Sequence, residues 1–138
     1  DPGASIHGLN FNRHGRAHVL RAAKEGIVFA LAYGLEVIRQ MGLTIETVRA
    51  GRANLFLSPL FAQIYATVNR TVVQLYDTDG AAGAARGAGV GAGVYASPEA
   101  AFQGVPPVAV VEPVAAWQEA YAAVYPRWCE TLSRQLQT

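Results

Sequence analysis

Short strand patterns alternate with helical patterns along this chain, and this alternation limits the fold class more than any other feature. Residues 44–50 (T-I-E-T-V-R-A) alternate strictly, and residues 71–76 (T-V-V-Q-L-Y) are rich in β-branched side chains. Helical spacing of apolar residues precedes the first strand over 15–41, and a Ser58-Pro59 helix start separates the two strands. The order predicts an α/β fold with parallel strands and right-handed crossovers.

The remaining elements follow from caps and spacing. Asp79 can cap a helix that begins near Gly80, and Ser97-Pro98-Glu99 begins a short helix. Residues 108–111 are expected to be extended, and residues 1–13 to form the tail of a strand that runs into a loop. We expect the helix over 15–41 to end at Gly42 and to pack through one set of apolar residues: Leu20, Ala23, Ile27, Ala30, Leu31, Gly34, Leu35, Ile38 and Met41. In the last helix, 114–136, the apolar side is expected to hold Trp117, Tyr121, Val124, Trp128 and Leu132.

Two strands make an unusually small sheet, and the chain begins with Asp1 rather than Met. We therefore expect upstream strands to complete the sheet, which makes residues 1–138 the carboxyl-terminal part of a domain. Strand 44–50 would then have an exposed edge in the isolated segment. That segment is expected to be ordered only beside other chain segments or a second copy, as in a homodimer. A compact monomer in sedimentation measurements would contradict this expectation.

Composition narrows the class of partner. The chain has eleven Lys and Arg residues and ten Asp and Glu residues, which gives a net charge of +1. This charge is too small to favour binding to nucleic acid or to an anionic membrane. The apolar stretches 26–35 and 81–94 are too short to span a bilayer, so no membrane segment is expected. Cys129 is the only cysteine, which excludes an internal disulfide and favours a cytoplasmic protein. We expect Cys129 to be a buried, small hydrophobic residue.

The glycine-rich stretch 80–93 allows two nucleotide interpretations. A G-x-G-x-x-G/A pattern occurs at Gly87, Gly89 and Ala92, but it lies within or at the end of a predicted helix rather than between a strand and a helix. A second interpretation uses two turns that follow strands, 50–54 and 77–81. If the strands are adjacent and parallel, these turns face one crevice, where a base or phosphate could approach backbone N–H groups. Alternatively, the glycines only allow helices to pack closely on the sheet.

Other chemistry is sparse. His14 and His18 have a zinc-compatible spacing and His7 is nearby, but no further ligand is placed with them, so we expect no metal site in this chain. Neither the phosphate-binding pattern G-x-x-x-x-G-K-[ST] nor the hydrolase pattern G-x-S-x-G is present. Glu25 is interpreted as an ordinary helix charge or as a contact near the active crevice.

Several stretches together resemble one family. Residues 4–9 (A-S-I-H-G-L), followed after eight residues by 18–26 (H-V-L-R-A-A-K-E-G), resemble the second signature of the FGGY carbohydrate kinases, although Lys24 stands where an apolar or aromatic residue is usual. Residues 58–63 (S-P-L-F-A-Q) resemble the S-P-L-W-x-Q helix start, and 80–85 (G-A-A-G-A-A) the A-L-G-A-A segment. The ending, Glu112-Pro113 and then Tyr121, Tyr125 and Trp128, is similar to the tail of the xylulose kinases in this family.

The resemblance implies a fold and a reaction. Such kinases have two domains of the ribonuclease-H-like, actin-like ATPase fold, with ATP held between them. Residues 1–138 would be the carboxyl-terminal part of the second, nucleotide-binding domain. The sugar site and the catalytic aspartate would lie in the first domain, outside this chain. The reaction implied is transfer of the γ-phosphate of Mg²⁺-ATP to a sugar hydroxyl, with D-xylulose as the expected sugar, and the segment alone should be inactive.

The same resemblance implies nucleotide-contacting residues: Gly51, Ala53, Asn54, Gly80 and Gly83. The family's first turn is usually written G-G-G-A, whereas residues 51–54 are G-R-A-N, with one glycine and a longer loop before Ser58. Arg52 could project over the base or the phosphates. Because of this departure, a non-catalytic binding or assembly module that retains the fold is the alternative function.

Overall fold

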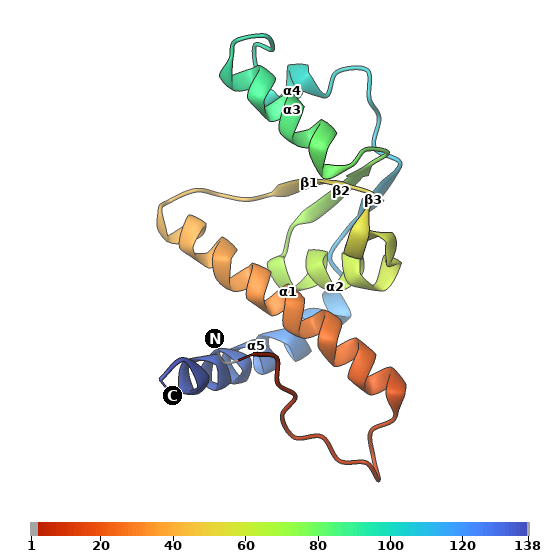
Figure 1. The fold of residues 1–138 in the computed structure, drawn as a ribbon, viewed down its shortest axis with the longest axis vertical. Coiled ribbons are helices and arrows are strands. Elements are labelled where there is room, and N and C mark those ends of the chain that lie inside the picture. Colours follow the sequence, from red (N-terminus) through yellow and green to blue (C-terminus); the bar gives the residue numbers. More distant parts are fainter. Residues whose placement is uncertain (1–2, 138) are drawn as a thin grey trace. The chain divides into compact units, whose positions relative to one another are not determined.

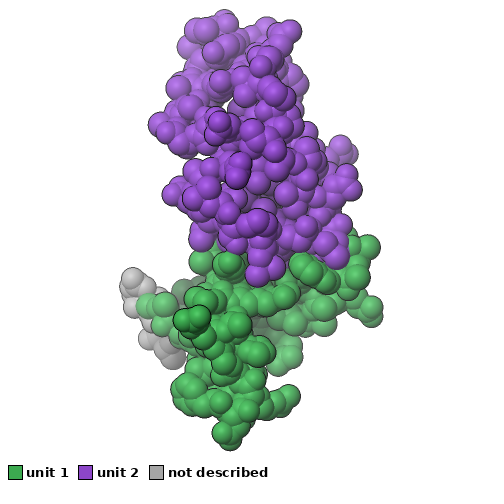
Figure 2. Space-filling view, turned by 90° about the vertical axis from the view of Figure 1, so that its right-hand side faces the viewer, with its two compact units in different colours: residues 1–43, 115–138 green, residues 44–114 purple. Residues whose placement is uncertain are grey.

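The computed structural model describes residues 3–137, and these form two compact units. Among the described residues, unit 1 combines 3–43 with 115–137, and unit 2 is the continuous segment 44–114 (Figure 2). Unit 1 contains the helices α1 (Arg16–Gln40) and α5 (Ala115–Leu136). The elements of unit 2, in chain order (Figure 1), are β1 (Thr47–Gly51), the short 3₁₀ helix η1 (Asn54–Leu57), α2 (Pro59–Asn69), β2 (Val72–Tyr76), α3 (Gly80–Gly91), α4 (Pro98–Ala101) and β3 (Ala109–Val111).

The sheet of unit 2 has three strands in the order β1-β2-β3. β1 and β2 are parallel, as the sequence predicts, and their register runs from Thr47 opposite Val72 to Gly51 opposite Tyr76. β1 begins three residues later than the expected strand 44–50 and ends one residue later, at Gly51. Thr71 still belongs to the turn after α2, and the register begins at Thr47 opposite Val72. Of the expected strand residues 44–46, Glu46 still accepts the Val72 N–H with its carbonyl at 2.9 Å.

β3 is antiparallel to β2, which differs from the all-parallel expectation. Ala109 lies opposite Leu75, and Val111 lies opposite Val73. The connection that contains α3 and α4 therefore begins and ends at the carboxyl end of β2 and does not cross the sheet. In Figure 1, α3 and α4 lie together beyond that end of β1 and β2. This connection places the start of α3 at the edge where both parallel strands end.

Capping side chains begin three helices of unit 2 where the sequence predicts. Ser58 Oγ accepts the Phe61 N–H at 3.4 Å, Asp79 Oδ1 accepts the Ala82 N–H at 2.9 Å, and Ser97 Oγ accepts the Ala100 N–H at 3.2 Å. The core of the unit lies on α2 and β2. Its buried apolar residues are Phe61, Ala62, Ile64, Tyr65, Ala66, Val73, Leu75, Tyr76 and Ala101.

The expected buried face of α1 is wrong. Leu20, Ile27, Leu31, Ile38 and Met41 are exposed, and α1 instead buries Val28, Phe29 and Ala32. The reason is the aromatic surface of α5. The Phe29 ring packs against Tyr121, Tyr125 and Trp128, at centroid distances of 6.1, 5.6 and 6.0 Å. The end of α1 is as predicted, because Gly42 adopts the left-handed conformation with φ = 83°.

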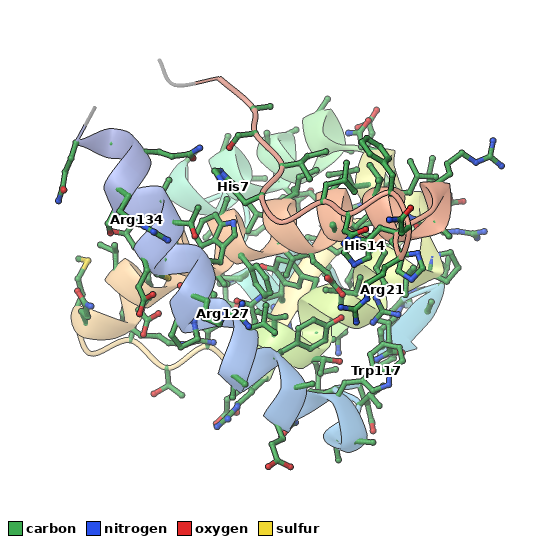
Figure 3. All side chains as sticks on the ribbon, turned by 90° about the horizontal axis from the view of Figure 1, so that it is seen from below. His7, His14, Arg21, Trp117, Arg127 and Arg134 are labelled. Carbon is green, nitrogen blue, oxygen red and sulfur yellow. The ribbon has the colours of Figure 1, made fainter. Side chains whose placement is uncertain are left out.

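A hydrogen-bonded triad connects α1 to α5 within unit 1. Glu25 Oε1 accepts Arg21 Nε at 2.8 Å and the Tyr121 hydroxyl at 2.9 Å, while Arg21 Nη2 donates to that hydroxyl at 3.1 Å. The Arg21 guanidinium also lies 5.4 Å from the Trp117 ring centroid (Figure 3). Burial raises the pKa of Tyr121, and the hydrogen bond to Glu25 raises the pKa of Arg21. Glu25 is therefore a structural contact within unit 1.

Tyr121→Phe is expected to destabilise the protein by about 1–2 kcal/mol, because it removes the hydroxyl that bonds Glu25 and Arg21 while keeping the ring in place. Urea denaturation of the complete protein measures this loss. Above about pH 10, tyrosine ionises in the unfolded chain, while the raised pKa of Tyr121 keeps it protonated in the folded protein. The wild type therefore loses stability as the pH rises, whereas the phenylalanine variant does not lose it at this position. The difference in stability between the two proteins should shrink accordingly. Tyr33→Phe, at an exposed position on α1, is the matched control and should change stability by less than about 0.5 kcal/mol.

Three smaller expectations are also corrected. Residues 3–13 contain no strand, and positions 1 and 2 of that expected segment lie outside the described residues. Val124 is exposed, because the turn of α5 that faces α1 presents Tyr125 instead. Cys129 is only half-buried. Within residues 3–137, no helix has both the length and the apolar character needed to cross a bilayer.

Candidate nucleotide site

The carboxyl ends of β1 and β2 bring the two predicted turns to one edge of the sheet. Gly51 is the last residue of β1 and lies opposite Tyr76, the last residue of β2. Beyond the ladder, the Arg52 N–H donates to the Tyr76 carbonyl at 2.8 Å, and the Thr78 N–H donates to the same oxygen at 2.8 Å. Both turns are thus fixed to one carbonyl group at the end of β2.

Gly51 allows these turns to make backbone contact. A Cβ atom at this position would collide with the Thr78 carbonyl oxygen and would lie 3.5 Å from Asp79 Cα. Every other amino acid carries a Cβ, so only glycine fits without a backbone shift. The missing side chain of Gly51 therefore serves the packing of the two turns, and it places the end of β1 directly beside the cap of α3.

The start of α3 presents an open surface of backbone and small side chains. Gly80 is exposed and Gly83 is half-buried. A Cβ built at either position would meet no atom within 4 Å. Neither glycine is required by packing within the described chain, in contrast to Gly51, and neither has a side chain that would cover this part of the helix.

Charges of both signs lie at this edge, since Arg52 follows Gly51 whereas two carboxylates stand directly before α3. Asp77 and Asp79 are both exposed, and Asp79 already caps the amide of Ala82. A helix N-terminus attracts anions through its free N–H groups and its dipole, but here a carboxylate occupies that position. The arrangement disfavours a phosphate at the start of α3. It suits a neutral group with hydroxyl donors, such as a nucleoside.

Ala53 and Asn54 continue from the Gly51 turn into η1. The Ala53 N–H donates to the Gly51 carbonyl at 2.8 Å, which makes a tight bend. Asn54 is exposed and has φ = 50°, in the left-handed region that asparagine tolerates better than most residues. Ala53 and Asn54 thus lie directly beyond the carboxyl end of β1, on the same turn as Gly51.

The other sequence candidates do not form sites. Gly87, Gly89 and Gly91 lie inside α3, as expected from the sequence, so they do not form a dinucleotide-binding turn. His14 and His18 each use Nδ1 to accept a backbone N–H, from Asn10 and Gly15 respectively. No three metal-ligating side chains come together in the part of the chain that the structure describes.

Sequence reasoning missed a cluster beside this edge. The Arg49 and Arg86 guanidinium groups lie 5.9 and 5.3 Å from the centroid of the Phe102 ring, which is 5.1 Å from the Tyr76 ring centroid. Arg86 Nη1 also donates to the Ala101 carbonyl at 2.6 Å. The four residues come from β1, β2, α3 and the end of α4, and no local pattern indicates such an assembly. The turn over 77–81 was expected at this edge, but Asp79 was expected only as a helix cap and Asp77 was given no role.

No protein-family profile and no curated protein sequence matches this chain. Its fold, however, is similar to solved sugar kinases. A xylulose kinase from Rhodospirillum rubrum has a TM-score of 0.75 at 24% identity, over 94% of this chain and 27% of the kinase. A xyloylose kinase from Brucella ovis has a TM-score of 0.73 at 25% identity, over 96% of this chain and 27% of the kinase. A Plasmodium falciparum glycerol kinase solved with ADP has a TM-score of 0.70 at 22% identity, over 96% and 26%.

These neighbours have an actin-like ATPase fold, and this chain spans about a quarter of the length of each. The described residues form an α/β structure with a small mixed sheet, and the similarity covers nearly all of them. The chain therefore has the fold of one quarter of a sugar kinase.

Proposed function

We propose that this chain supplies the adenosine-binding side of the ATP site of a sugar kinase, as the carboxyl-terminal part of its second domain. The observation that carries the proposal is the backbone contact at Gly51, which joins two strand-end turns beside the open surface of Gly80 and Gly83. In open α/β sheets, ligands bind beyond the carboxyl ends of the strands. The likeness to sugar kinases, one of them solved with ADP, supports the same assignment.

The residues suggest how adenosine would bind. The base would lie on the surface of Gly80 and Gly83, next to the turn of Gly51, Ala53 and Asn54. Ribose hydroxyls would donate hydrogen bonds to the carboxylates of Asp77 and Asp79. The phosphates would point away from these carboxylates, since like charges repel, and the exposed Arg52 could reach them.

The proposed reaction is transfer of the γ-phosphate of ATP to a sugar, with D-xylulose giving xylulose 5-phosphate. A sugar hydroxyl oxygen forms a bond to the γ-phosphorus, the bond from that phosphorus to the bridging oxygen breaks, and ADP leaves. The proton of the hydroxyl goes to a base that we place outside residues 1–138. Mg²⁺ would accompany ATP, held mainly by the phosphates and water, and we assign it no ligand among the described residues. A cytoplasmic location fits a kinase that uses ATP.

A non-catalytic binding or assembly module is the second candidate. The turn over 51–54 has one glycine where the kinase pattern has three, and that glycine is used for packing against Thr78. A protein that kept the fold but lost turnover could tolerate this change.

A coupled assay of ADP release by the complete protein distinguishes the two candidates. We expect turnover on at least one member of a panel of pentuloses, hexuloses and polyols, with a pentulose as the best substrate. The isolated segment 1–138 is the control and should release no ADP above the rate without enzyme. Absence of turnover on the whole panel, together with retained ATP binding, would favour the non-catalytic module.

A further inference from the structure

Helix α3 is weakly stabilised by its own sequence. Five of its twelve residues are glycine, the poorest helix former after proline, and none of its residues is buried. A helix without a buried face depends on a few specific contacts, and such segments open locally more easily than the rest of a protein. The contacts that hold α3 therefore decide how well its first turn is positioned.

Besides its packing against α4 and β1, α3 has polar contacts at its two ends and at one side chain in the middle. The Asp79 side chain caps the first turn. At the other end, the Gly89 carbonyl accepts the N–H groups of Val94 and Tyr95 at 2.8 and 3.2 Å. Between them, Arg86 reaches out of the helix, donates to the Ala101 carbonyl at 2.6 Å and lies over the Phe102 ring. Both contacts of Arg86 are strong because the guanidinium group is charged.

The partners of Arg86 are anchored in the core of unit 2. Ala101 is 3% exposed, and the Phe102 ring packs on Tyr76, which is 5% exposed and ends β2. Arg86 thus links α3, through Phe102 and Tyr76, to the same strand end that accepts the Arg52 and Thr78 N–H groups. The link runs from the middle of the helix to the edge of the candidate site.

We infer that Arg86 is a positioning residue for the nucleotide, and that α3 opens locally without nucleotide and becomes ordered when adenosine binds. This inference rests on the proposed function. A ligand that contacts only the ordered helix stabilises it by linkage, and its affinity falls when the ordered population falls. Loss of Arg86 therefore weakens nucleotide binding without removing any group that touches the nucleotide.

Hydrogen exchange in the complete protein tests the inference. We expect amides in residues 81–91 to exchange at least about tenfold faster in Arg86→Ala than in the wild type without nucleotide, while β2 is unchanged. Added ATP should slow exchange over 81–91 in the wild type. In kinetic assays, the KM for ATP should rise about tenfold, with kcat at saturating ATP and the KM for the sugar each within about twofold. Arg86→Lys, which retains one charged donor, should restore part of the affinity.

Two further variants separate a specific link from general damage. Arg49→Ala removes the other guanidinium from the Phe102 ring, but β1 is held by its ladder to β2, so exchange over 81–91 should remain near the wild-type rate. Gly87→Ala adds a methyl group where no atom lies within 4 Å, and it should slow exchange over 81–91 about fivefold because alanine favours the helix.

The outcomes are distinguishable. Unchanged exchange in Arg86→Ala, or an equal acceleration in Arg49→Ala, overturns the role of Arg86 even if ATP binds normally. If, without nucleotide, the amides of residues 81–91 are as well protected from hydrogen exchange as those of β2, the proposed local opening of α3 is wrong. Failure of the wild type to bind ATP overturns the proposed function and the coupling with it, whatever the exchange rates show.

Discussion

Gly83→Leu is expected to weaken ATP binding to the complete protein by at least about 100-fold. The leucine side chain would occupy the surface on which we place the base, so the base would lose its contact with the protein. A 100-fold loss of affinity corresponds to about 2.7 kcal/mol of binding free energy. The fold should be retained, because a Cβ at Gly83 meets no atom within 4 Å and leucine favours a helix more than glycine does. Isothermal titration with ATP, in the presence of Mg²⁺, measures the loss.

Gly91→Leu is the matched control for this prediction. Gly91 lies in the same helix, is exposed and has room for a Cβ, which would also meet no atom within 4 Å. It lies about 12 Å farther along the helix axis than Gly83. The affinity of this variant for ATP should stay within about threefold of the wild type. Equal losses of affinity in the two variants, or no loss in Gly83→Leu, would show that the base does not bind at the start of α3.

Gly51→Ala is expected to destabilise the protein by about 3 kcal/mol, since the added methyl group collides with the Thr78 carbonyl oxygen and one of the two turns must move. The displaced turn should also weaken ATP binding. Urea denaturation and the midpoint of thermal unfolding measure the loss of stability.

Gly80→Ala makes the same chemical change at the same edge of the sheet. A Cβ at Gly80 meets no atom within 4 Å, so stability should be unchanged or slightly higher. If Gly51→Ala is as stable as Gly80→Ala, the close contact between the two turns is wrong. The comparison therefore tests the geometry of the site separately from its ligand.

Local signals in the sequence predicted most elements of the fold. Helix caps at Ser58, Asp79 and Ser97 act over three residues, so their effect is visible without tertiary structure. The buried face of α1 was not predictable in this way, because residues 27–33 are all apolar and their spacing does not single out one face. The face is set by aromatic side chains of α5, which lie about ninety or more residues later in the chain.

The site was predictable only in outline. Parallel pairing of two β-branched strands implied that the turns after 50 and 76 share one edge, and the register of β1 and β2 confirms this. The role of Gly51 in backbone packing depends on the path of the Thr78 turn, and the cluster of Arg49, Arg86, Phe102 and Tyr76 depends on four separate elements. Contacts of this kind follow from the tertiary arrangement, which no local pattern encodes. The nucleotide contacts themselves remain predictions.

Photolabelling with 8-azido-ATP tests the central claim most directly, because the reactive azide is carried by the adenine ring. The complete protein would be irradiated with the probe, with and without excess ATP, and the modified peptides identified by mass spectrometry. We expect an adduct, suppressed by ATP, within residues 51–57 or 77–91. Adducts that ATP suppresses but that lie only outside these two segments would contradict the adenosine site proposed here.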